Sequence, residues 1–257
     1  MKFELLPSTF DENGKASSRQ HLACFVVDDC VAFDAGSLAL ACRERQLADI
    51  RDIVLTHAHL DHIAGLPLFI DDLYSTLEKP VTIHATSEVI EVLERHIFNW
   101  EIYPKFSELQ NKNGPVMVYQ PFTVGKEFSV KHLSITPLAV NHRVPTAGFI
   151  ISDGSSSIAM SGDTWKMEGF WPNVNTQGIS ALLIECAFPN ELEELAAISH
   201  HLTPKSLEAE IGKFTRTDCP IYIINIKPAY RETVIGQIKD LRSDKINILE
   251  VGRVYDF

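Results

Sequence analysis

Four side chains of the kinds that bind metal ions lie within six positions of the chain, in the run THAHLDH at residues 56–62. This run follows a short apolar strand predicted over Asp52–Leu55 and leads into a predicted helix. In an extended backbone residues two apart share a face, so His57 and His59 can point at one ion. Asp61 and His62 stand where the helix begins and project in another direction. Imidazole and carboxylate together suit zinc, and also manganese or iron, so the run predicts two neighbouring ions.

Two ions need more ligands than four, and we expect the others at strand ends further along the chain. His142 follows a predicted strand over Leu133–Val140, and Asp163 follows one over Ser156–Ser161. Functional side chains gather in loops at such strand ends, so both residues are candidate ligands. Each also has a structural alternative, because a Gly-Asp pair is typical of a turn and an Asn-His pair is unremarkable.

The elements that must position these residues alternate strand and helix patterns in the first third of the chain. The strand candidates there are Cys24–Asp28, Val31–Asp34, Ile53–Thr56 and Val81–His84, and the helix candidates are Leu38–Leu47, Leu66–Leu77 and Glu88–Phe98. Turn residues then separate four strand candidates, at Val116–Tyr119, Glu127–Val140, Ala147–Asp153 and Ser156–Ser161. We expect these four strands to be antiparallel.

From residue 181 onward strands and helices alternate again. The strand candidates are Ala181–Glu185, Ile221–Asn225 and Ile246–Leu249, and the helix candidates are Thr203–Phe214 and Ala229–Leu241. Periodicity by itself gives mixed α and β structure with two packed sheets. Two β-rich halves with helices on their outer faces imply an α/β fold, a four-layer αββα sandwich.

The composition favours a single domain over residues 1–257. No repeat, low-complexity tract or flexible linker interrupts the chain, and 45% of its residues are hydrophobic. No apolar run approaches the ~18–20 residues that span a bilayer. The first residues lack the apolar stretch of a signal peptide, and the five cysteines form no Cys-x-x-Cys pair, as is typical of reduced, buried thiols. We therefore expect a cytoplasmic protein with no membrane partner.

The charge balance bears on the class of ligand. The formal net charge is −11, from 34 acidic and 23 basic side chains. Such a field repels polyanions, which disfavours nucleic acid as a partner, although the same balance also serves solubility. The sequence leaves the oligomeric state open, with a homodimer among the states that it allows.

The order of the candidate ligands resembles that of the metallo-β-lactamase superfamily: His-x-His-x-Asp-His after a strand, then a distant histidine, then Gly-Asp. Within that superfamily the chain resembles the class II 3′,5′-cyclic nucleotide phosphodiesterases. The matching stretches are FDAG at 33–36, THAHLDHIAGL at 56–66, HIFNWEIYPKF at 96–106, AGFII at 147–151, SGDT at 161–164, IECAFPN at 184–190, HLTP at 201–204 and NIKP at 225–228. The stretch THAHLDHIAGL indicates only the superfamily. The stretches HIFNWEIYPKF and HLTP together indicate the phosphodiesterase family within it.

The resemblance implies the metallo-β-lactamase fold and a centre with two Zn²⁺ ions, with manganese or iron as alternatives. The ligands that it implies are His57, His59 and His142 for one ion, Asp61 and His62 for the other, and Asp163 as a bridge between them.

Further roles also follow from the resemblance. It places His201 near the scissile phosphate, as the catalytic group that gives a proton to the departing oxygen or stabilises the charge of the transition state. Asp61 would also help to orient the attacking water. Asp34 would orient a metal ligand, although a plain turn after a strand explains it equally well. Lys227 is the nearest basic candidate for a phosphate contact, and its structural alternative is a solvated strand end.

The chain departs from the family pattern at Asn225. The family's last ligand is normally a histidine at this position, and an amide oxygen is a weaker zinc ligand than imidazole. Asn225 is therefore a candidate weak ligand. The ion held by Asp61, His62 and Asp163 would bind more loosely, be a harder ion, or be absent from purified protein.

The activity implied by the resemblance is hydrolysis of 3′,5′-cyclic nucleotides, cyclic AMP first among them, to nucleoside 5′-monophosphates by a metal-dependent phosphodiesterase. The partner is then a small-molecule cyclic nucleotide. Two alternatives remain open. One is another hydrolase of the superfamily, like a tRNA 3′-processing nuclease or a lactonase. The other is a non-catalytic, metal-stabilised nucleotide-binding protein in which Asn225 marks a degenerate second metal site.

Other conspicuous side chains favour structural interpretations. These are the histidines His21, His84, His96 and His132, which lie in or beside apolar segments. Six aromatic residues are most simply core packing, although such rings can also stack on a nucleobase: Phe98, Trp100, Tyr103, Phe106, Trp165 and Trp171.

Overall fold

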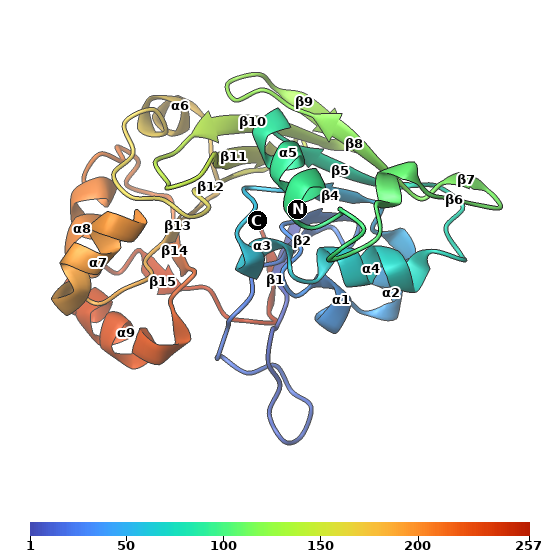
Figure 1. Ribbon diagram of the computed structural model, residues 1–257. Coiled ribbons are helices and arrows are strands. Elements are labelled where there is room, and N and C mark those ends of the chain that lie inside the picture. The colour runs from blue at the N-terminus through green and yellow to red at the C-terminus, as the bar shows by residue number, and fades with distance from the viewer. The chain divides into compact units, whose positions relative to one another are not determined.

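The computed structural model describes residues 1–257, which form two seven-stranded sheets, each flanked by helices (Figure 1). Contacts between Cα atoms divide the chain into two compact units. The first unit comprises Lys2–Thr123 and Val251–Asp256, and the second comprises Val124–Glu250 with the terminal residues Met1 and Phe257. The predicted mixed α/β class with two sheets is confirmed, and a single domain over residues 1–257 stays a prediction.

The sheet of the first unit has the strand order β16-β1-β2-β3-β4-β5-β8. Its strands are β1 (Lys2–Leu5), β2 (Phe25–Val27), β3 (Val31–Phe33), β4 (Asp52–Val54), β5 (Val81–Ala85), β8 (Met117–Pro121) and β16 (Val254–Asp256). Strands β3, β4, β5 and β8 run parallel, so their carboxyl ends lie at one edge of the sheet. Strands β16, β1, β2 and β3 pair antiparallel in turn.

Helices with one apolar face cover this sheet. They are α1 (Leu38–Ala41), α2 (Glu44–Asp49), α3 (Leu60–Ile63), α4 (Leu66–Leu73), α5 (Ser87–His96) and the 3-10 helix η1 (Phe106–Glu108), and a hairpin of β6 (Gln110–Asn111) and β7 (Gly114–Pro115) follows. Phe69 and Ile70 of α4 are buried against strand residues such as Ile53 and Ile83. This apolar burial, worth about 25 cal/mol per Å², fixes α4 on the sheet.

The single helix predicted over Leu38–Leu47 is wrong, because the structure has two helices there. Cys42 leaves the helical region with φ −65° and ψ 137°. Arg43 then turns its guanidinium onto the carboxylate of Glu4 at 2.7 and 2.8 Å and onto Asp29 at 3.0 Å. Because Glu4 is buried, its charge needs this partner. The break therefore serves a tertiary ion pair that helical periodicity does not reveal.

The sheet of the second unit has the order β15-β14-β13-β12-β11-β10-β9. Its strands are β9 (Phe128–Val130), β10 (Leu133–Ala139), β11 (Ala147–Ser152), β12 (Ser157–Met160), β13 (Ala181–Glu185), β14 (Ile221–Ile224) and β15 (Ile246–Ile248). Strands β9 to β12 pair antiparallel, and β12 to β15 pair parallel. Strands β10, β12, β13 and β14 therefore run in the same direction, and their carboxyl ends share one edge.

Two strand predictions need correction. The segment Val116–Tyr119 was predicted to join the antiparallel group, but its strand β8 lies in the first sheet and pairs parallel with β5. The strand predicted over Glu127–Val140 is a hairpin instead, because Lys131 adopts φ 52° between β9 and β10. A positive φ ends an extended strand, and lysine gives no sign of one in sequence.

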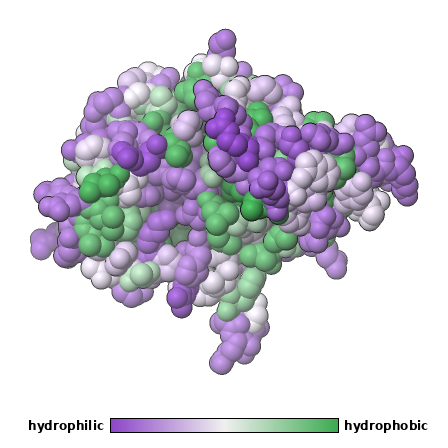
Figure 2. Space-filling model, in the orientation of Figure 1, coloured by the Kyte–Doolittle hydropathy of each residue, from purple (hydrophilic) through white to green (hydrophobic).

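The helices of the second unit are α6 (Trp171–Thr176), α7 (Glu193–Ser199), α8 (Pro204–Ile211), α9 (Arg231–Asp240) and the 3-10 helices η2 (Asn190–Leu192) and η3 (Pro228–Tyr230). Leu207 of α8 and Val234 of α9 are buried against strand residues such as Leu182 and Ile223. None of the protein's helices combines the length and hydropathy that a transmembrane span needs. Apolar patches alternate with hydrophilic side chains on the face drawn in Figure 2.

Gly36 occupies a position where no side chain fits. A Cβ atom there would lie 2.0 Å from the carbonyl oxygen of Asp61 and 2.8 Å from that of Ala23. Both neighbours are backbone atoms, and the amide of Ala23 donates to that same Asp61 carbonyl at 2.8 Å. Gly36 therefore lets the chain after β3 pass directly against the backbone that carries Asp61.

We predict that Gly36→Ala destabilises the protein by about 3 kcal/mol, at the upper end of overpacking effects. Gly236→Ala is the control, because Gly236 lies within α9 and a Cβ atom there would extend into open space. Alanine there should stabilise the helix by ~0.5–1 kcal/mol. The free energies of unfolding in urea measure both effects, and equal stabilities of the two variants would contradict the packing described for Gly36.

Candidate metal centre

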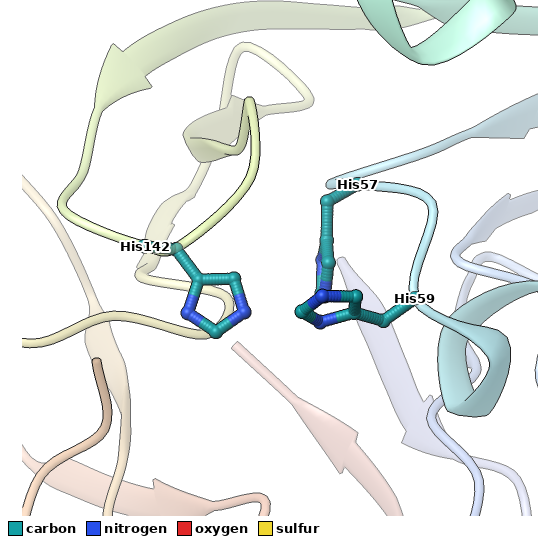
Figure 3. Close-up of side chains that lie close together, drawn as sticks. All are labelled: His57, His59 and His142. Carbon is teal, nitrogen blue, oxygen red and sulfur yellow. The ribbon is translucent and has the colours of Figure 1, made fainter. Parts of the chain in front are cut away.

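The run at residues 56–62 forms a histidine cluster at the carboxyl end of β4. His59 is the N-cap residue of α3, with extended backbone at φ −66° and ψ 147°. The ring centroids of His57 and His59 lie 4.6 Å apart, and those of His57 and His62 lie 4.1 Å apart. Figure 3 shows the rings of His57 and His59 directed from this loop to the same side. Asp61 is half-buried in the first turn of α3. The first unit thus brings its predicted ligands into one loop.

A buried carboxylate fixes this histidine cluster from behind. Asp34, which follows β3, has an exposed fraction of 1%. Its Oδ2 lies 2.6 Å from Nδ1 of His62, and its Oδ1 accepts a hydrogen bond of 2.8 Å from the amide of Thr56. The Thr56 hydroxyl also lies 2.9 Å from Nδ1 of His57. Because both Nδ1 atoms are engaged, Nε2 is the atom that each ring can offer to an ion. These are the contacts that the predicted orienting role of Asp34 requires.

A second cluster lies in the second unit, at the carboxyl ends of its strands. His142 follows β10 and Asp163 follows β12, and the ligand atoms of His142, Asp163 and His201 lie within 4.8 Å of one another. The His142 ring, also labelled in Figure 3, has Nδ1 3.0 Å from the carbonyl oxygen of His200. Nε2 of His201 lies 4.0 Å from Oδ2 of the buried Asp163. The cluster therefore combines two imidazoles with one carboxylate.

Glu185, a residue that no sequence motif marks as functional, fixes His201. It ends β13 with no exposed surface, and its Oε1 lies 2.8 Å from Nδ1 of His201. The amides of Thr164 and Ala187 donate to the same carboxylate at 2.7 and 3.1 Å. The sequence signal for Glu185 is its place at the end of the apolar strand ALLIE. A carboxylate in such a strand is buried, and a buried charge needs partners.

Burial and charge oppose each other in this pair. Burial raises the pKa of the Glu185 carboxyl, and the neighbouring imidazole only partly offsets that effect. Burial works to lower the pKa of His201, but the carboxylates of Glu185 and Asp163 together outweigh it and the pKa of His201 rises. The protonated imidazole is therefore favoured at this position.

Asn225 and Lys227 follow β14 at the same sheet edge. Asn225 has a left-handed backbone, with φ 56°, and its Nδ2 donates a hydrogen bond to Oδ1 of Asp163. The amide nitrogen, rather than the oxygen that could bind a metal, thus faces Asp163. The backbone amide of Lys227 donates to the carbonyl of Ala187 at 3.2 Å, and its side-chain charge acts on His201. The roles predicted for Asn225 and Lys227 stay predictions.

The donor atoms of both clusters fit a divalent ion. Imidazole nitrogen and carboxylate oxygen are ligands that zinc, manganese and iron share. Four of the five histidines of the two clusters, His57, His62, His142 and His201, have a carboxylate, hydroxyl or carbonyl oxygen at Nδ1, the arrangement that orients metal-binding imidazoles. His84 differs, because its Nε2 bonds to Asp52 at 3.0 Å in the body of the sheet. The predicted ligands therefore have the surroundings of metal sites.

We predict that Asp34→Asn weakens metal binding by about 10- to 100-fold, because the amide orients the His62 ring less firmly than the carboxylate does. Competition with a chromophoric chelator measures the affinity. Asp52→Asn is the matched control, since it removes a carboxylate from the His84 pair outside both clusters. Equal affinities in wild type and Asp34→Asn would contradict the orienting role.

Comparisons with known proteins identify the family of the chain. A family model described as "Beta-lactamase superfamily domain" matches residues 26–212. A relative from Yersinia pestis, named probable 3′,5′-cyclic-nucleotide phosphodiesterase, is 26% identical over 79% of this chain and 63% of its own length. A nuclear ribonuclease Z from Triticum aestivum is 28% identical over 54% of this chain and 81% of its own. The chain thus spans less than two thirds of the Yersinia relative.

Two solved structures share the fold at low identity. Unliganded yeast PDE1 aligns with a TM-score of 0.78 and 16% identity, covering 98% of each chain. The metallo-β-lactamase fold protein YhfI from Bacillus subtilis aligns with a TM-score of 0.73 and 17% identity, covering 99% of this chain and 98% of its own. The predicted metallo-β-lactamase fold is confirmed. Because the family model spans most of the chain, this protein belongs to the β-lactamase superfamily.

Proposed function

We propose that the protein is a metal-dependent phosphodiesterase that hydrolyses 3′,5′-cyclic nucleotides, with cyclic AMP as the first candidate, to nucleoside 5′-monophosphates. The observation that carries the proposal is His201, held at Nδ1 by the buried Glu185 with its Nε2 4.0 Å from Asp163. The name of the Yersinia pestis relative supports the choice of substrate. The cytoplasm stays the predicted compartment.

In the proposed enzyme the two clusters together form one metal centre. His57, His59 and His142 would hold one ion, Asp61 and His62 the other, and Asp163 would be shared. Zinc is the first candidate, and manganese and iron suit the same donors. A pair of such ions supplies positive charge and water activated at neutral pH.

His201 is proposed to act as the general acid. Its Nδ1 bonds to Glu185, so the proton to be transferred is on Nε2, the nitrogen nearer Asp163. Since the Glu185 carboxylate favours the protonated ring, His201 can deliver that proton to the O3′ that leaves when the P–O3′ bond breaks. Glu185 then holds the neutral ring in place for reprotonation.

Net charge favours a small substrate over a nucleic acid. A cyclic nucleotide carries one negative charge, whereas a tRNA precursor is a polyanion that a protein of net charge −11 repels. A tRNA-processing activity remains the second candidate, because the wheat ribonuclease Z covers half of the chain at 28% identity. A lactonase-like hydrolase and a non-catalytic nucleotide-binding protein are the further alternatives.

We predict that His201→Gln lowers kcat for cyclic AMP by ~10²–10⁴-fold, because glutamine cannot transfer the proton. Bound metal, measured by elemental analysis, should be unchanged. His84→Gln is the control, since it also removes a histidine paired with a carboxylate. If His201→Gln turns over cyclic AMP at the wild-type rate, His201 has no part in the reaction.

A substrate panel separates the candidate functions. Wild-type protein should hydrolyse cyclic AMP or cyclic GMP and bis(p-nitrophenyl) phosphate but leave a tRNA precursor intact. Two metal equivalents per chain are expected, with loss in His57→Ala and in Asp163→Ala. Cleavage of the tRNA precursor alone would favour the nuclease. One metal equivalent with nucleotide binding and no turnover would favour the binding protein.

A further inference from the structure

In the second unit Phe188 lies beside His201 and Tyr230 lies beside Phe188, and neither ring has a part in the proposed proton transfer. The Phe188 ring meets the His201 imidazole edge to face, with centroids 5.6 Å apart and planes at 68°. The Tyr230 ring lies 5.9 Å from the Phe188 ring, at 49°. Both side chains are only half-buried, so part of each aromatic surface remains accessible.

Backbone hydrogen bonds fix these rings relative to His201. The amide of Phe188 donates to the carbonyl of Leu202, the residue after His201, at 3.2 Å. The amide of Lys227 donates to the carbonyl of Ala187 at 3.2 Å, and that of Tyr230 donates to the carbonyl of Lys227 at 3.0 Å. The Tyr230 ring also packs against the core of the second unit. The two rings thus form a preorganised pair, which lowers the entropy cost of binding.

A cation accompanies the aromatic pair. Lys227 is half-buried, and its backbone amide donates to the carbonyl of Ala187, the residue before Phe188, at 3.2 Å. Lys227 thus lies in the segment that carries Tyr230 and is bonded to the segment that carries Phe188. An aromatic surface and a positive charge within one segment, residues 227–230, suit a ligand that carries both a flat ring and an anion.

Four of the aromatic residues singled out in the sequence do not offer such a surface. Phe98, Phe106 and Trp171 are buried in the two cores, with exposed fractions of 0%, 1% and 3%. Trp100 is 57% exposed, but its indole bonds to Glu108 in the first unit. Trp165 lies against His200, with ring centroids 5.8 Å apart, whereas Phe188 has its ring in contact with the proposed general acid itself.

We propose that Phe188 and Tyr230 form a subsite for the flat heteroaromatic base of a nucleotide whose phosphate lies toward His201 and Lys227. This inference rests on the proposed function for the position of the phosphate. Stacking of one base on a protein aromatic ring changes affinity by about 5- to 150-fold. Such a subsite would make the protein bind a nucleotide more tightly than a phosphate ester that lacks an aromatic ring.

Calorimetric binding of two ligands to the metal-loaded protein tests the subsite. Adenosine 5′-monophosphate carries the base, and ribose 5-phosphate carries the same phosphate without it. We expect wild type to bind adenosine 5′-monophosphate more tightly. Phe188→Leu keeps an apolar side chain but removes the flat ring, so it should raise the Kd of adenosine 5′-monophosphate about 5- to 150-fold and leave ribose 5-phosphate unchanged.

Two variants control for general damage to the fold. Phe188→Tyr keeps the ring and should retain the wild-type preference. Tyr222→Leu alters another half-buried aromatic pair of the second unit, in which the Tyr222 and Phe257 rings lie 5.5 Å apart, and it should bind both ligands normally. Tyr230→Leu provides an independent second test of the subsite. Thermal unfolding of each variant checks that it is folded.

The outcomes separate this inference from the proposed reaction. The subsite is overturned if wild type binds the two ligands with equal Kd values, even if it hydrolyses cyclic AMP. It is also overturned if Phe188→Leu and Tyr230→Leu weaken the binding of the two ligands equally. A base preference that Phe188→Leu abolishes supports the subsite even if wild type hydrolyses no cyclic nucleotide. In that case only the proposed reaction fails.

Discussion

The constraint on which the candidate site depends is that a buried carboxylate must be paired. Both units pair such a carboxylate with Nδ1 of a histidine. In the first unit Asp34, directly after a strand, bonds to His62. In the second unit Glu185, at the end of a strand, bonds to His201. Each pair fixes the ring and leaves Nε2 as the atom that can act on an ion or a proton. One physical solution thus serves a proposed metal ligand in one unit and a proposed acid in the other.

Strand direction explains why these groups gather. In the second unit β10, β12, β13 and β14 run the same way, so the loops after them share one sheet edge. Loops at the carboxyl ends of parallel strands are where α/β proteins place their sites. The backbone at these loops is locally strained, because His200 and Asn225 in the second unit, and Asp34 in the first, adopt a positive φ. Asp, Asn and His tolerate that conformation better than most residues, and here their side chains or carbonyls serve the site.

Neighbouring side chains that contact the candidate ligands and His201 modify the chemistry that these groups can perform. Asn225 directs its amide nitrogen to Asp163, a proposed ligand. The Phe188 and Tyr230 rings give His201 an aromatic neighbour on one side. Such contacts distinguish members of one fold family, because the fold supplies the scaffold and local side chains decide the ligand.

The sequence by itself determined the mixed α/β class, most strands and the histidine run at residues 56–62, because these depend on short-range periodicity and spacing. It also placed His142 and Asp163 at strand ends. Only the tertiary structure decided the break after Cys42, the membership of β8 in the first sheet and the contact of Glu185 with His201. Each of these depends on a partner distant in sequence, such as Glu4 for Arg43, and local propensity carries no information about such partners.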